Sequence, residues 1–262
     1  MLRHRRPEKT SLGLLGLAFL CTGAFAQNPS PPSASPGWTG TLGAGLVAFP
    51  KYVGGKSTQS VLLPIAYVDY KDWFYVDLYR AGAYIWASDD KKQGLSLAVE
   101  PRIGFTSADG PRLAGMATRR STLFGGLAYS AENTLGSMSL GYFTDLGNAS
   151  RGGYLDLLLN RPLVKNDRLE LTGTLELSRT DSKLANYYFG VSPGEVTPSR
   201  PLYTPGSATN LTLWLTGQYN LNKQYAVMFG ANVTRLGASA AASPIVERRD
   251  VPFLYLGFGT NL

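Results

Sequence analysis

Apolar and polar residues alternate along most of the chain after Trp38. In residues 93–106 the apolar side chains fall on one set of alternate positions, and the remaining positions are mostly polar or small. The same period of two recurs in residues 167–178 and 209–220. Because successive side chains of a strand point to opposite faces, these segments are predicted to be β-strands with one apolar and one polar face. The apolar positions of the first segment are Leu95, Leu97, Val99, Ile103 and Phe105.

Segment length separates two kinds of all-β protein. Sandwich strands are usually about five or six residues long, whereas about 9–11 residues are needed for a tilted strand to cross a bilayer. The segments here run to roughly ten residues, as transmembrane strands do. We therefore predict an antiparallel transmembrane β-barrel with its apolar face toward lipid. Aromatic residues lie near the segment ends, as in the interfacial girdles of such barrels: Trp38, Phe49, Tyr70, Trp73, Tyr142, Phe143, Tyr219, Tyr225 and Phe253.

The last segment also reads as a strand. Leu254, Leu256, Phe258 and Leu262 fall on one face, and Thr260 interrupts it. This pattern resembles the C-terminal signal that the barrel-assembly machinery reads, although that signal usually ends in an aromatic residue. The expected surroundings of the protein are outer-membrane lipid and lipopolysaccharide, in a Gram-negative bacterium.

Topology gives the strand number. Periplasmic turns are short, external loops are long and both termini are periplasmic, so the number of strands is even. The alternating segments give eleven strands if residues 73–86 form one strand. A bend at Arg80-Ala81-Gly82 divides that segment and gives the favoured number of twelve strands, and ten would result if one weak segment were a loop. The expected external loops are 106–120, 179–208 and 237–251.

The N-terminus predicts export. Basic residues precede an apolar stretch, Ser11 to Cys21, that is too short to span a bilayer, and Ala24-Phe25-Ala26 fits a signal-peptidase site. We expect a signal peptide over residues 1–26, cleaved between Ala26 and Gln27. A flexible linker rich in proline and serine follows over 27–37, and the barrel occupies 38–262.

Cleavage changes the chemistry that the chain can offer. It removes the single histidine (His4) and the single cysteine (Cys21), and the loss of four basic residues and Glu8 lowers the formal charge from +7 to +4. No basic stripe with interleaved aromatic residues is present, which argues against nucleic-acid binding. Without histidine or cysteine we expect no enzyme activity, no cofactor and no metal site.

Five charged residues are predicted to point into the lumen: Glu100, Arg102, Asp156, Glu170 and Glu176. One interpretation is a polar channel or ligand site. The other, which we favour, is that Arg102 pairs with these carboxylates and fills a barrel of about twelve strands, which has little aqueous width.

Several motifs resemble the MipA/OmpV family of outer-membrane proteins, which includes the MltA-interacting protein. They are Pro50-Lys51-Tyr52-Val53-Gly54-Gly55, Leu63-Pro64, Gly115-Met116 followed by Arg119, Asn186-Tyr187-Tyr188-Phe189-Gly190-Val191 followed by Tyr203 and Gly206, and Ser243-Pro244-Ile245-Val246. With the terminal strand, the resemblance covers residues 38–262.

The resemblance implies a non-enzymatic barrel that serves as a scaffold for murein assembly, with a lytic transglycosylase and a murein synthase as partners. It implies no catalytic residues. The alternative is a porin-like diffusion channel or a surface-exposed adhesin or ligand-binding barrel, which the polar inner face and the long outer loops would suit.

Overall fold

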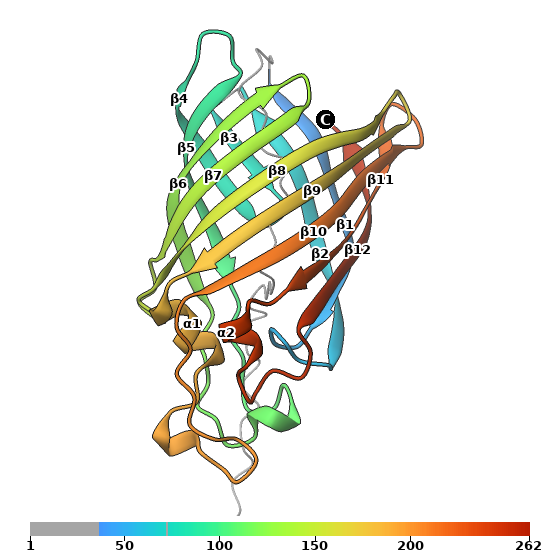
Figure 1. The fold of residues 1–262 in the computed structure, drawn as a ribbon. Helices are drawn as coiled ribbons and strands as arrows, with labels where there is room; N and C mark the ends of the chain where they lie inside the picture. The colour runs from blue at the N-terminus through green and yellow to red at the C-terminus, as the bar shows by residue number, and fades with distance from the viewer. Residues whose placement is uncertain (1–36, 72) are drawn as a thin grey trace, which may run out of the picture.

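The computed structural model describes residues 37–71 and 73–262. The predicted signal peptide, its cleavage site at Ala26 and Gln27, and nearly all of the predicted linker lie outside the described residues. Within them, twelve antiparallel strands form a closed barrel in which sequence neighbours pair and the first strand pairs with the last (Figure 1). The prediction of a twelve-stranded antiparallel barrel is therefore confirmed. The strands are β1 (Trp38–Pro50), β2 (Thr58–Tyr70), β3 (Phe74–Asp77), β4 (Arg80–Ala87), β5 (Gln93–Arg102), β6 (Thr122–Asn133), β7 (Gly136–Asp145), β8 (Gly153–Lys165), β9 (Leu169–Thr180), β10 (Ala208–Asn220), β11 (Tyr225–Arg235) and β12 (Asp250–Asn261).

The two ends of the barrel differ. Long loops gather at one end, where they carry the helices α1 (Ser182–Phe189) and α2 (Ala238–Ala241), while tight turns and the C-terminus occupy the other end (Figure 1). Two 3₁₀ turns, Pro111–Leu113 and Pro193–Glu195, also belong to the long loops. Among the described residues, no helix combines the length and apolarity needed to cross a bilayer. Since the short turns of outer-membrane barrels face the periplasm, the helical end is the outer end.

The predicted alternation holds along the long strands. On β10, Leu211, Leu213 and Leu215 are exposed, whereas Thr212 and Trp214 are buried. The exposed leucines form an apolar outer surface that matches the lipid around it. The buried residues point into the lumen, so the apolar and polar faces have the sense expected of a membrane barrel.

The outer end of β5 departs from this pattern. The strand ends at Arg102, and Ile103 and Phe105 are buried and do not face lipid. Ile103 packs in an apolar cluster with lumen residues, and Phe105 forms a bridge with Arg119 across the following loop. The prediction that both residues are lipid-facing is wrong, because the chain leaves the barrel wall before reaching them.

Three of the aromatic residues assigned to the girdles lie inside the barrel. Phe49, Phe143 and Phe253 are almost fully buried, and the rings of Phe49 and Phe253 stack with centroids 6.5 Å apart. A position near a strand end does not fix which face a side chain occupies. Because these three rings are buried, they lie on the inner face. The predicted girdle residues with exposed side chains are Trp38, Trp73, Tyr142, Tyr219 and Tyr225.

A short hairpin replaces the bend that we expected at residues 80–82. β3 has four residues, Asp77 pairs with Arg80, and Leu78 and Tyr79 form the turn between them. Leu78 adopts a positive φ of 53° and donates its N–H to the Ala66 carbonyl at 2.7 Å. The bend assignment is therefore wrong in detail, and Arg80 is a strand residue with a buried side chain.

The seam between β1 and β12 closes the barrel. It runs from the pair Thr41–Asn261 to the pair Ala48–Leu254. The strands approach so closely that a Cβ on Gly43 would lie 2.1 Å from the Phe258 carbonyl oxygen, which explains the glycine there. The side chains of Leu254, Leu256 and Phe258 on β12 are exposed together, as predicted, and Leu262 just beyond the strand is exposed too.

The lipid-facing surface makes a stability prediction. Leu213 lies near the middle of β10 and is 55% exposed. Replacing Leu213 with arginine should destabilise the barrel by about 2–4 kcal/mol, because a charge near the bilayer midplane is costly. The urea midpoint of the protein folded in phospholipid vesicles measures the loss. Leu221→Arg in a periplasmic turn is the matched control and should change the midpoint little, so equal losses would contradict the lipid-facing assignment.

Candidate functional site

A buried ion cluster lies in the lumen. Arg80 on β4 donates through Nη2 to Glu100 on β5 at 2.8 Å and to Asp156 on β8 at 3.3 Å, and its Nε also reaches Glu100 at 3.1 Å. All three side chains are inward positions of the alternating pattern and are at most 11% exposed. The cluster therefore joins β4 and β5 to β8 across the inside of the barrel.

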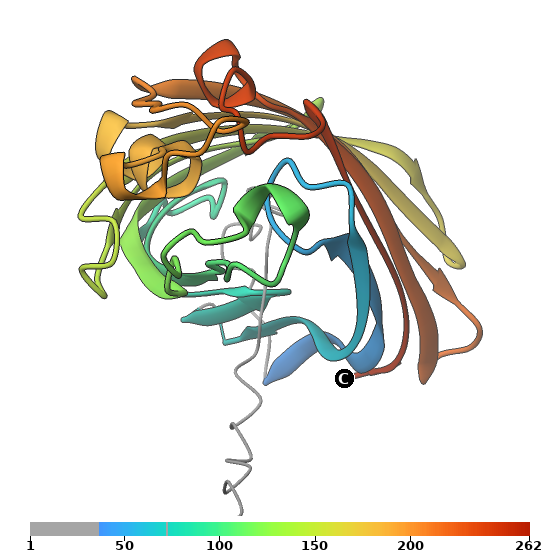
Figure 2. The same ribbon diagram turned by 90° about the horizontal axis from the view of Figure 1, so that it is seen from below.

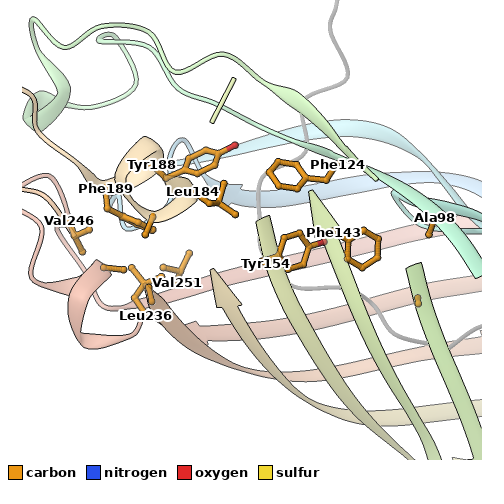
Figure 3. Packing of buried hydrophobic residues seen from close by; sticks show 14 of the residues in the cluster. Ala98, Phe124, Phe143, Tyr154, Leu184, Tyr188, Phe189, Leu236, Val246 and Val251 are labelled. Carbon is orange, nitrogen blue, oxygen red and sulfur yellow. The ribbon is translucent and has the colours of Figure 1, made fainter. Parts of the chain in front are cut away.

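Aromatic rings surround the two arginines of the lumen. The guanidinium of Arg80 lies 4.6 Å from the ring centroid of Phe143, and that of Arg102 lies 4.0 Å from Tyr154. Tyr154 also donates its hydroxyl to Glu100, and its ring stacks on Phe143 at 5.2 Å (Figure 3). A cation in a desolvated place is stabilised by such ring faces. The rings thus complete a packed plug.

A third buried carboxylate lies nearby. Glu176 on β9 is 2% exposed and accepts a hydrogen bond of 3.1 Å from the indole Nε1 of Trp214 on β10. Trp214 belongs to an apolar cluster that fills the lumen beside β1, β2 and β12. Indole and carboxylate therefore connect the charged side of the lumen to its apolar side.

The five predicted lumen residues are not all together. Glu100 and Asp156 share the cation of Arg80, Arg102 lies 3.6 Å from Glu100, and Glu176 is buried in the same region. Glu170 is separate: it is exposed and lines the inner mouth of the barrel.

The central cation is Arg80, a residue that the alternating pattern predicted to lie in a bend. The short ion pairs of the lumen are therefore made by Arg80, and Arg102 mainly stacks on rings. The sequence did contain this information. Tyr84 and Gly82 are alternate positions of one face of β4, and continuing the period of two places Arg80 on the same inner face. The turn at Leu78 and Tyr79 interrupts the alternation, so the pattern did not reveal the inward position of Arg80.

The long loops form a packed cap over the outer mouth, which Figure 2 shows end-on. At its centre Arg119 forms a bidentate ion pair with Glu195, in which Nη1 donates to Oε1 at 2.8 Å and Nη2 donates to Oε2 at 3.0 Å. Burial raises the pKa of Glu195, but the hydrogen bonds from Arg119 and from Ser192 outweigh it and hold that pKa at about 2 instead of the usual 4.5. The ion pair fastens the 103–121 loop to the 181–207 loop.

Other side chains tie the cap together through backbone carbonyls. Arg200 donates to the carbonyls of Arg112 and Ala114 at 2.7 and 3.0 Å. Tyr52 donates its hydroxyl to the Ile245 carbonyl at 3.0 Å. Burial raises the pKa of Tyr52 above its usual value, so this phenol stays protonated as a donor.

The inner end of the barrel contains a cavity of about 740 Å³. We call it the inner vestibule. Its walls are the periplasmic ends of the strands, and they carry carboxylates, amides, hydroxyls and one lysine. The lining residues used below are Thr41, Tyr67, Asp69, Tyr75, Asp77, Glu132, Lys165, Glu170, Gln218, Asn220 and Asn261. Within the part of the chain that the structure describes, no group of three or more histidine, cysteine, aspartate or glutamate side chains could hold a metal ion.

The sequence of this barrel also matches a known protein family. The family described as MltA-interacting protein MipA matches residues 42–259. The chain belongs to this family. The match runs from within β1 to within β12, so membership and fold support one another.

Three relatives of this MipA-family chain are named outer-membrane proteins. The outer membrane proteins Omp26La of Vibrio anguillarum and OmpV of Vibrio cholerae are each 29% identical over 133 residues, 51% of this chain and 51% of their own length. The putative outer membrane protein YiaT of Escherichia coli K12 is 23% identical over 213 residues, 80% of this chain and 85% of its own. The chain thus matches about half the length of the Vibrio relatives, and it is an outer-membrane β-barrel protein.

The motifs that suggested the family lie mostly in the outer cap. Tyr52, Arg119 and Tyr203 make the loop-to-loop hydrogen bonds, and Met116 and Val191 pack in the cluster beneath them. Most of them hold loops together, and none of them belongs to the ion cluster of Arg80, Glu100 and Asp156. The family motifs are therefore explained by the packing of the cap.

The ion cluster predicts a strong dependence on Arg80. Replacing Arg80 with alanine leaves Glu100 and Asp156 buried without their cation, so the barrel should lose about 3–5 kcal/mol of stability. The midpoint of denaturant unfolding measures the loss.

The matched control is Arg235→Ala, which removes an exposed pair with Asp250 at 2.8 Å and should have a small effect. Adding Glu100→Gln and Asp156→Asn to the Arg80 variant should restore part of the stability. No recovery would show that the buried charges are not the cause.

The cap should loosen in acid. Because the pKa of folded Glu195 is about 2 and its usual value is 4.5, the stability that it gives is complete above 4.5 and is lost as the pH falls toward 2. Hydrogen exchange of residues 181–207, corrected for the intrinsic rate, should therefore speed up in that window. A Glu195→Gln variant should lack the acid-dependent step, and an unchanged step in that variant would contradict the assignment.

Proposed function

We propose that the protein is a non-enzymatic scaffold of the outer membrane that engages murein-assembly enzymes through its periplasmic end. The observation that carries this proposal is the filled lumen. The cluster of Arg80, Glu100 and Asp156 crosses it, apolar residues pack beside the cluster, and the loops cover the outer mouth. A barrel filled in this way supports a structural role better than the diffusion-channel alternative.

The family description supports the identity of the partners. It names the family by an interaction with MltA, a lytic transglycosylase, and the murein synthase follows from the family resemblance. The periplasmic turns offer apolar side chains for such contacts. Trp73, Leu135 and Leu221 are 76%, 66% and 53% exposed there. These side chains are the contacts that the proposal assigns to the partners.

A second candidate function is binding at the cell surface, and the charge of the outer loops favours it. The loops 51–57, 103–121, 146–152, 181–207 and 236–249 contain ten lysines and arginines against four aspartates and glutamates, a net charge of +6. Such an end attracts anionic groups, including the phosphates of lipopolysaccharide. This would suit an anchoring contact or an adhesin.

The scaffold proposal is tested by affinity capture from envelope extracts. The tagged barrel should enrich a lytic transglycosylase and a murein synthase relative to an unrelated barrel. Changing Trp73, Leu135 and Leu221 together to serine should abolish the enrichment, because it removes the apolar groups of the periplasmic turns.

Leu202→Ser is the matched control, since Leu202 is 57% exposed in the outer cap. Capture equal to that of the unrelated barrel would overturn the proposal. Planar-bilayer recording tests the channel alternative in parallel: we expect no discrete conductance, and regular conductance steps would favour a channel.

A further inference from the structure

The inner vestibule is negatively charged, in contrast to the outer end of the barrel. Its lining contains four carboxylates, Asp69, Asp77, Glu132 and Glu170, and one cation, Lys165, which gives a formal charge of −3. The charge therefore changes sign from one end of the barrel to the other. We propose that the vestibule is a binding site for a flexible polar molecule that carries two or more protonated amines.

The carboxylates are placed on opposite walls. Asp69 and Asp77 lie on β2 and β3, and Glu170 lies on β9, which is six strands from β3 in the closed ring. One oxygen of Asp77, Oδ1, is buried and has no hydrogen-bond partner among the described residues. An ammonium group would supply the missing donor. A molecule with separated amines could reach both walls.

Neutral acceptors line the wall between them. Thr41 donates to Asn261 Oδ1 at 2.8 Å, and Gln218 donates to Asn220 Oδ1 at 2.9 Å. Those two oxygens each accept a second hydrogen bond within this network, whereas Gln218 Oε1 accepts from Thr41 at 3.1 Å and keeps a lone pair for a ligand N–H or O–H group. The rings of Tyr67 and Tyr75 add faces that attract cations. The lining therefore suits a ligand that is polar as well as cationic.

The size and the closed outer side of the vestibule favour binding over passage. About 740 Å³ lies within the range of small-molecule pockets, which is roughly 300–1,000 Å³. Beyond the vestibule, Asp77 pairs in the ladder with Arg80, whose guanidinium occupies the lumen. The packed side chains of Arg80, Glu100 and Asp156 therefore block the movement of a ligand farther outward. The inference does not depend on whether the barrel also serves as a scaffold.

Titration calorimetry on the folded full-length barrel in detergent tests the inference. The probes are spermidine, the peptide trilysine and the uncharged sugar chitotriose. Spermidine or trilysine should bind with a stoichiometry of one and weaken as salt is added, and chitotriose should not bind. Binding of trilysine alone would identify a peptide source of the amines, and binding of spermidine alone a polyamine source.

Two variants locate the site. Asp77→Asn should weaken binding of the cationic probe by about tenfold, because it removes a charge from a partly enclosed place. Glu170→Gln removes a charge at the exposed mouth and keeps the test usable if the Asp77 variant does not fold. Asp89→Asn is the matched control, since Asp89 lies in a periplasmic loop outside the vestibule. Absence of binding, equal binding of chitotriose, or unchanged affinity in both site variants would overturn the proposal.

Discussion

A lipid bilayer offers no hydrogen-bonding partner to a peptide group, and this constraint governs the whole molecule. Twelve strands satisfy it along most of the wall by pairing in sequence order, and the seam between β1 and β12 closes the ring. The short β3 leaves residues 58–66 of β2 paired with β1 alone. Pro64 lies in that stretch, and proline is tolerated at such an edge because it has no N–H to leave unpaired.

Closure creates an inside that must be filled. The alternation that gives lipid an apolar surface sends serine, threonine, arginine and glutamate into a narrow lumen. Arg80, Glu100 and Asp156 satisfy one another there, while Phe143 and Tyr154 pack against the arginines. Removing one member of such a group costs more than the group contributes, because the remaining charges stay buried.

The two ends of the barrel are built for different surroundings. Long outer loops are joined by Arg119, Glu195 and Arg200 into a cap with a basic surface. The inner end has short turns, exposed apolar side chains and an acidic vestibule. The proposed contacts with murein-assembly enzymes use the inner end. The family motifs concentrate in the cap, where their side chains add contacts between loops to the backbone hydrogen bonds there.

The sequence by itself determined most of the strands, the two faces of their regular stretches and the even strand number. It placed Glu100, Asp156 and Glu176 at alternate positions that the structure buries, but it misassigned the faces of Ile103, Phe105 and three aromatic residues. The correct assignments follow from a period of two, which depends only on local backbone geometry. Only the tertiary structure decided which charges meet. Arg80 became the central cation because a hairpin at Leu78 and Tyr79 places it opposite Glu100, and Asp156 reaches it from β8, 76 residues away. Contacts across the lumen depend on closure, and no local pattern encodes them.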